Sequence, residues 1–114
     1  LLHRQVIANC LQIRLYASTN FREGEEVAIA ALPFYHILAL VLNCMLGVYR
    51  GDRQILITNP RDIPRFVKTI AKSRFSFMVG VNTLYTALLN NPDIRSVDFS
   101  NLKMCGGGGA PVQL

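Results

Sequence analysis

Cysteine is scarce in this 114-residue chain, which carries Cys10, Cys44 and Cys105. An odd number without metal-ligand spacing argues against a disulfide framework or a zinc site, and it fits a reducing compartment in which each cysteine is a small core residue. Long apolar runs are lacking too. The most apolar stretch, residues 36–49, is shorter than the roughly 20 residues that cross a bilayer. The sequence therefore predicts neither a disulfide-stapled nor a membrane-spanning protein.

Acidic residues are fewer than basic ones, 7 against 12, which gives a formal net charge of +5. The basic residues are scattered and no aromatic residues interleave with them, so we predict no nucleic-acid groove. Four of them share one helical face, which we interpret as a solvated face: Arg61, Arg65, Lys68 and Lys72. Contact of basic residues with anionic lipid headgroups remains an open alternative.

The chain is one domain at most by its length, yet its hydrophobic content of 51% and mean hydropathy of +0.29 exceed what a soluble domain of this size needs. There is no initiator Met and no signal peptide. We therefore expect residues 1–114 to be a single piece of a longer protein. We also expect its uncovered apolar surface to favour homo-oligomers.

Helical patterns alternate with short buried strands along the chain. Strands are expected near residues 26–32, 54–58, 75–79 and 102–106, with helical segments before and between them. The helix over 36–49 is apolar almost all round and should be buried, while Asp62 and Asn82 are predicted to cap the two later helices. Strands separated by helices form a parallel sheet with right-handed crossovers, so the predicted fold class is α/β with a mostly parallel, four-stranded sheet.

Ligands of such sheets bind beyond the carboxyl ends of the strands, which places residues 34–36, 58–59, 80–82 and 106–111 on one rim. The last of these segments contains four consecutive glycines, 106–109, followed by Ala110 and Pro111. Glycines allow positive φ and close approach of a ligand to the main chain, and Pro111 stiffens the exit. Two interpretations stay open: a backbone wall against which a flat ligand lies, or a disordered tail.

Two motifs in this order resemble a known superfamily. Residues 31–36, Ala-Leu-Pro-Phe-Tyr-His, are similar to the Leu-Pro-aromatic-aromatic-His motif of AMP-forming adenylating enzymes, and residues 107–111, Gly-Gly-Gly-Ala-Pro, are similar to their Gly-Gly-Ala-Pro turn. The stretches between them, at 57–62, 80–84 and 87–91, resemble bacterial long-chain fatty acid–CoA ligases in particular. Residues 2–4 resemble the segment after the phosphate-binding loop, so the resemblance covers essentially the whole chain.

The resemblance implies part of the N-terminal AMP-binding domain of an acyl-CoA synthetase, a ligase of fatty acid metabolism. Such enzymes join a fatty acid to ATP as an acyl-adenylate, release pyrophosphate, and pass the acyl group to coenzyme A. ATP, Mg²⁺ and coenzyme A would serve the full-length parent, and none is expected to bind this piece tightly. The phosphate loop, the Glu that holds Mg²⁺, the ribose-binding Asp and the catalytic Lys would lie outside it, so the piece alone should be inactive.

The resemblance also implies roles for named residues. His36 would contact the reacting carboxylate as a catalytic residue, and Gly80 and Val81 would line the fatty-acyl pocket. The tract would present its backbone to the acyl-adenylate, with the last two residues nearest the adenine: Gly107, Gly108, Gly109, Ala110 and Pro111. No residue is expected to bind a metal. The alternatives are a structural histidine at position 36 and a stand-alone α/β nucleotide- or acyl-binding module without catalysis. We expect a cytoplasmic location, and peripheral association with the inner face of the membrane stays an open alternative.

Overall fold

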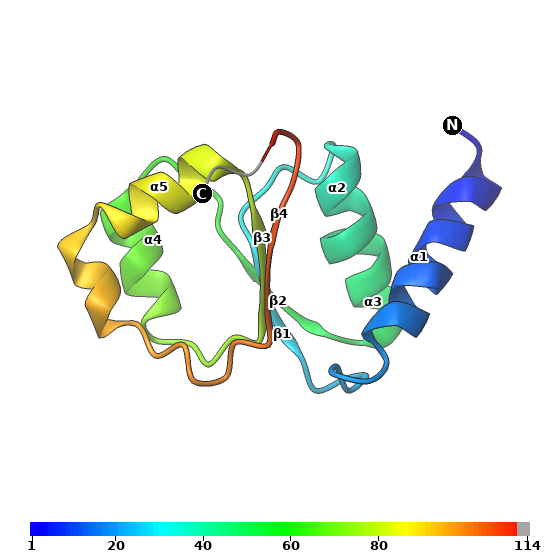
Figure 1. Cartoon of the computed structure of the whole chain (residues 1–114), viewed down its shortest axis with the longest axis horizontal. Helices are drawn as coiled ribbons and strands as arrows, with labels where there is room; N and C mark the ends of the chain where they lie inside the picture. Colours follow the sequence, from blue (N-terminus) through cyan, green and yellow to red (C-terminus); the bar gives the residue numbers. More distant parts are fainter. Residues whose placement is uncertain (112–114) are drawn as a thin grey trace.

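A four-stranded sheet between two layers of helices forms the computed structural model, which describes residues 1–111 (Figure 1). The strand order is β2-β1-β3-β4 and every neighbouring pair is parallel. The strands are β1 (Val27–Ala30), β2 (Arg53–Leu56), β3 (Phe77–Gly80) and β4 (Met104–Gly107). The predicted α/β class is confirmed.

The glycine tract begins inside the sheet. β4 starts two residues later than predicted and extends to Gly107, so that Gly106 pairs with Val79 and Gly107 with Gly80. The interpretation as a disordered tail is therefore wrong for Gly106 and Gly107. Residues 112–114 lie outside the described residues.

The two helical layers follow from the strand order. The chain passes from β1 to β2 through α2 (Ile37–Ala39), η1 (Leu40–Met45) and α3 (Leu46–Arg50). It then reverses direction across the sheet, from β2 through α4 (Ile63–Ile70) to β3 and onward through α5 (Asn82–Leu89) and η2 (Pro92–Ser96) to β4. Because right-handed crossovers in opposite directions put their helices on opposite faces, α2–α3 cover one face and α4 and α5 the other (Figure 1).

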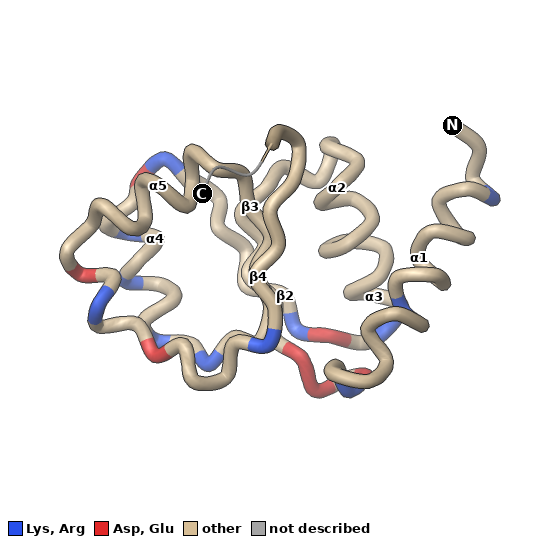
Figure 2. Tube along the Cα trace, in the orientation of Figure 1, with Lys and Arg blue, Asp and Glu red and all other residues tan. Residues whose placement is uncertain are grey.

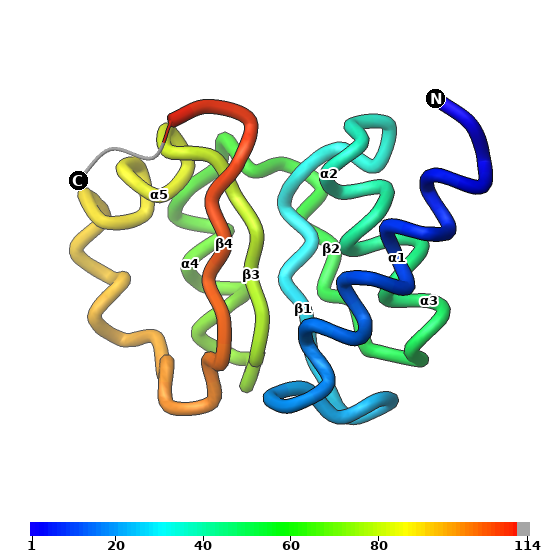
Figure 3. Tube along the Cα trace, turned by 45° about the vertical axis from the view of Figure 1, so that its right-hand side comes forward, coloured from blue at the N-terminus to red at the C-terminus, as the bar shows by residue number. Residues whose placement is uncertain are grey.

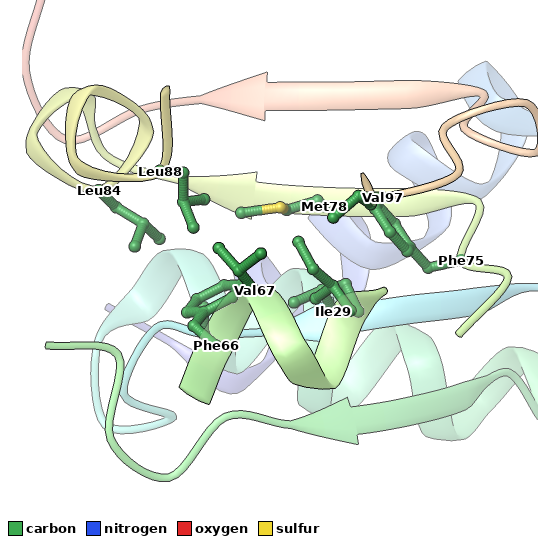
Figure 4. Packing of buried hydrophobic residues seen from close by; sticks show 10 residues of the cluster. Ile29, Phe66, Val67, Phe75, Met78, Leu84, Leu88 and Val97 are labelled. Atoms are coloured by element: carbon green, nitrogen blue, oxygen red, sulfur yellow. The ribbon is translucent and has the colours of Figure 1, made fainter. Parts of the chain in front are cut away.

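Helix α4 shows how the sequence builds the larger core. Asp62 accepts a hydrogen bond from the Arg65 N–H at 3.1 Å, and Pro64 occupies the first turn, so the predicted cap is confirmed. Phe66, Val67 and Ile70 recur at helical spacing and are at most 1% exposed. They pack against the sheet with side chains from α5, from the strands and from the segments before β3 and after η2 (Figure 4): Ile29, Phe75, Met78, Leu84, Leu88 and Val97.

The second face is covered less completely, and the single buried helix predicted over 36–49 is wrong. The segment divides into α2, the π-helical turn η1 and α3. Helix α1 (His3–Ala17) packs on one side of it through a small cluster of Cys10, Val41 and Leu46. The opposite side faces solvent, where Val48 is 76% exposed. The sheet and α1 cover two sides of the segment and leave the rest in solvent, so an all-apolar pattern did not mean burial on all sides here.

The cysteines were predicted as core residues, which is correct for Cys10 only. Cys44 is half-buried, and Cys105 is exposed because β4 is the edge strand of the sheet. Within residues 1–111, no helix has the length and apolar character needed to cross a membrane.

Candidate functional site at the carboxyl ends of the strands

The strand order creates a topological switch point between β1 and β3. These strands are neighbours, but the chain leaves β1 toward α2 on one face and leaves β3 toward α5 on the other (Figure 3). The divergence of the two connections opens a crevice at the carboxyl ends of the strands, which is where open α/β sheets bind ligands. The loops that border it are residues 31–36 after β1, which contain the predicted rim residues 34–36, and residues 80–82 after β3, which were predicted as rim residues.

A hollow of about 360 Å³ lies at this rim. Its wall combines the loop after β1, the turn after β2 and the start of α5: Ala31, Leu32, Pro33, Pro60, Arg61, Ile63, Val81, Thr83, Leu84 and Ala87. Charged residues gather mainly at the opposite edge of the sheet, so the rim beside β4 and α2 is largely uncharged (Figure 2). Among residues 1–111 there is no cluster of three His, Cys, Asp or Glu side chains that could hold a metal ion.

His36 stands at the start of α2 and has a structural contact of its own. Its Nδ1 accepts a hydrogen bond of 3.3 Å from the Leu38 N–H, so the imidazole caps the helix. In the neutral ring this leaves the proton on Nε2, which can then act as a hydrogen-bond donor. The side chain is exposed rather than enclosed. The predicted location at the rim is confirmed, and a role toward a carboxylate stays a prediction.

Gly80, at the end of β3, is a glycine for a reason that the sequence did not reveal. A Cβ at this position would lie 3.0 Å from Cζ of Tyr85 and 3.2 Å from Cδ2 of Leu84. The missing side chain therefore makes room for the Tyr85 ring to lie across the end of the strand. A role of Gly80 in lining an acyl pocket stays a prediction, as does that of Val81 beside it.

The glycine tract packs between the starts of α2 and α5. A Cβ at Gly108 would lie 3.1 Å from Cδ2 of Leu38, and one at Gly109 would lie 3.8 Å from Cγ1 of Val81. Gly109 has φ +82°, a backbone conformation that L side chains rarely adopt, so any side chain there is strained whatever the space around it. The tract is thus a defined turn whose glycines satisfy packing and backbone geometry.

Two side chains of α5 hold the tract, and sequence reasoning missed both. The Tyr85 hydroxyl donates to the Gly106 carbonyl at 2.6 Å, and the Asn82 amide donates to the Pro111 carbonyl. The prediction that Asn82 caps α5 is wrong, because Val81 is the cap residue and Asn82 is the first helical residue, with its side chain directed to the tract. In the sequence, an asparagine at the start of a helix is typical of a cap. Its actual partner, Pro111, follows β4 and lies 29 residues away, so only the structure shows it.

The model of the family described as AMP-binding enzyme matches residues 1–114. Long-chain-fatty-acid–CoA ligases from Salmonella typhimurium and Haemophilus influenzae are 49% and 47% identical to the chain, covering 99% of it and 20% of each relative. The ATP-bound structure of MatB from Rhodopseudomonas palustris matches with a TM-score of 0.76 and 27% identity, covering 98% of this chain and 21% of that one. The chain therefore spans about a fifth of the length of these relatives.

A four-stranded parallel sheet with helices on both faces and a topological switch point defines an open α/β fold. The family match over the whole chain is more specific: the chain belongs to the AMP-binding enzymes. The predicted resemblance to AMP-forming adenylating enzymes, and among them to long-chain fatty acid–CoA ligases, is confirmed.

Proposed function

We propose that this chain is part of the N-terminal domain of a long-chain fatty acid–CoA ligase, which activates a fatty acid with ATP and transfers the acyl group to coenzyme A. The observation that carries the proposal is the 49% identity to such a ligase over 99% of the chain. The share of the relatives that is covered, 20%, means that most of the proposed enzyme lies in other segments.

The described residues suit the acyl-adenylate more than the triphosphate. Beside Ala110 and Pro111 lies an open hollow lined by uncharged polar side chains, including Asn82, Thr83 and Thr86, which offer hydrogen bonds of the kind a nucleobase or ribose uses. None of the described residues that line this hollow carries a charge, so they offer no cation to the triphosphate. ATP binding as a whole therefore needs residues beyond this set, as the resemblance implies.

Mg²⁺ does not fit the described residues, because residues 1–111 bring together no set of three candidate ligands. We therefore assign it no residue here. Coenzyme A is proposed as the acyl acceptor from the likeness to the ligases alone. A cytoplasmic location, peripheral contact with the membrane and homo-oligomers through exposed apolar surface also remain proposals.

His36 is proposed to act at the reacting carboxylate. With Nδ1 accepting from the Leu38 N–H, the opposite nitrogen presents an N–H that can donate to a carboxylate or acyl-phosphate oxygen. A donor placed there lowers the barrier to adenylation to the extent that the bond strengthens in the transition state. The glycine turn supplies backbone surface beside the same ligand, and Gly80 and Val81 lie at the proposed acyl end.

The test is fatty-acid-dependent ATP–pyrophosphate exchange by the complete enzyme that contains this chain. We expect exchange with long-chain fatty acids and none from the 114-residue chain alone. His36→Ala should lower the exchange rate by about 10²- to 10³-fold, as removal of a transition-state donor does, while the KM for ATP changes less. An active enzyme in which His36→Ala matches wild type would refute the role of His36, and an enzyme without exchange would refute the proposed function.

A further inference from the structure

Two side chains of helix α5 form hydrogen bonds with the two ends of the glycine turn, residues 106–111. We propose that Tyr85 and Asn82 are positioning residues, which hold the backbone of residues 106–111 in the orientation that receives the acyl-adenylate. This inference rests on the proposed function for the identity of the ligand. The two hydrogen bonds, which we call the clamp, are contacts that the structure shows.

Tyr85 holds the strand end of the turn. Its ring lies across Gly80, and its hydroxyl donates to the Gly106 carbonyl at 2.6 Å, so it joins α5 to the end of strand β4. Burial raises the pKa of Tyr85, and the adjacent Cys105 side chain raises it further. The hydroxyl is therefore protonated, and able to donate, throughout the pH range in which enzymes are assayed.

Asn82 holds the exit of the turn. Proline has no N–H, so the carbonyl is the only backbone group of Pro111 that can form a hydrogen bond, and the Asn82 amide donates to it. Pro111 and Asn82 both border the uncharged hollow in which the adenosine part of the ligand is proposed to lie. Removal of this bond should release the adenine end of the turn.

The residues between these anchors are held from the same side. The Gly108 N–H donates to the Gly80 carbonyl at 3.3 Å, and Val81 lies against Gly109. A segment with four glycines has little conformational preference of its own, because glycine has the greatest backbone freedom. Its orientation must then come from its neighbours, namely residues 80–85 on one side and Leu38 on the other.

Substitutions at the two anchors separate positioning from general stability. Tyr85→Phe keeps the ring over Gly80 and removes only the hydroxyl, and Asn82→Ala removes only the amide. Because Tyr85 holds the end nearer the acyl pocket, Tyr85→Phe should raise the KM for the fatty acid by about 3- to 10-fold in pyrophosphate exchange and leave the KM for ATP within twofold. Asn82→Ala should raise the KM for ATP by about 3- to 10-fold and leave the KM for the fatty acid within twofold. Tyr49→Phe and Asn20→Ala, exposed and away from the rim, are the matched controls.

Equal changes of both KM values, changes confined to thermal stability, or no change in an active enzyme would overturn the inference. If wild type shows no fatty-acid-dependent exchange, the proposed function fails, and the clamp is then judged by amide hydrogen exchange. Each variant should accelerate exchange of the Gly108 N–H, which donates to the Gly80 carbonyl between the two anchors, by at least about threefold over the controls, since each removes one hydrogen bond that holds this turn. Unchanged protection in both variants would refute the clamp.

Discussion

The two faces of the sheet are built on different principles. The face under α4 and α5 is apolar throughout, and Phe66, Phe75 and Ile29 are at most 1% exposed there. The face under α1–α3 buries the polar residues Glu26, Asn43 and Arg50, and Glu26 and Arg50 border a largely apolar hollow of about 50 Å³ there. The first face holds together by hydrophobic burial, while the second depends on how well its buried polar groups are paired.

Pairing on the second face is incomplete among residues 1–111. The Arg50 Nε donates to Asp52 at 2.7 Å, but both terminal nitrogens of its guanidinium lack a hydrogen-bond partner within the described chain. The Asn43 amide donates to Gln54 at 3.1 Å, and its own carbonyl oxygen has no partner there. Buried polar atoms without partners cost free energy, so this face contributes less to stability than the area it buries suggests.

The largest expected effect is on the apolar face. Phe66→Ala removes a fully buried ring from the centre of the cluster and should lower the free energy of unfolding by about 3–5 kcal/mol. Urea denaturation followed by circular dichroism measures the loss. Phe34→Ala, whose half-buried ring lies in the loop after β1, is the control and should cost less. A loss below about 1 kcal/mol for Phe66→Ala would show that this face is not the main source of stability.

A pair of leucines compares the faces directly. Leu88 in α5 and Leu46 in α3 are 5% and 7% exposed, so each truncation to alanine removes a similar buried side chain. Both should destabilise by about 2–5 kcal/mol, with Leu88→Ala at the higher end because its close-packed surroundings cannot relax. Leu46 already borders a hollow and makes fewer contacts to lose. Equal losses from urea titrations would remove the distinction between the faces.

The sequence predicted the apolar face well because its signals are local. Asp62, Pro64 and the spacing of Phe66, Val67 and Ile70 together specify α4, and the strand positions follow from short apolar runs between helices. The second face was predicted less well. Residues 36–49 are apolar on all sides, so no stripe indicates which side packs or where the helix adopts a π-helical turn.

The rim was predicted from topology alone, because parallel strands bring their carboxyl ends to one edge wherever each helix packs. The contacts within the rim were not predictable in the same way. Tyr85 and Gly106 are 21 residues apart, and Asn82 and Pro111 are 29 apart, so no local pattern marks either hydrogen bond. The predicted strand at 102–106 contains only the first glycine of the tract, and a run of glycines gives no pattern that distinguishes a strand end from a turn.

Acid should weaken the polar face through Glu26. Burial raises the pKa of this carboxyl, but hydrogen bonds from Lys103, Ser76 and the Arg22 N–H outweigh that effect, so its pKa is below the ordinary value. A carboxylate with a lowered folded-state pKa adds stability above its unfolded pKa of about 4.3, and that stability is lost as the pH falls through the folded pKa.

Glu26→Gln should therefore reduce the stability difference between pH 6 and pH 3 that urea titrations give for wild type. Glu25→Gln is the matched control, because Glu25 is exposed and lies 3.8 Å from Arg22 in a solvated pair worth little. If the two variants keep the same pH dependence as wild type, the charge of Glu26 does not support this face.

The smallest effect is expected at the cap of α4. It tests whether a residue that marks the start of a helix in the sequence also stabilises the folded protein. Asp62→Ala removes the acceptor of the Arg65 N–H, which is then left without a partner in the protein. The substitution should lower the free energy of unfolding by about 1 kcal/mol. Asp62→Asn keeps an equally good cap and should stay within about 0.5 kcal/mol of wild type. Both are read from the same urea titrations as the leucine pair.

Equal losses for the two variants would show that the charge of Asp62, acting on the helix dipole, matters more than the hydrogen bond. No loss in either would mean that α4 is fixed by burial of Phe66, Val67 and Ile70 alone, so that the cap marks where the helix begins without stabilising it.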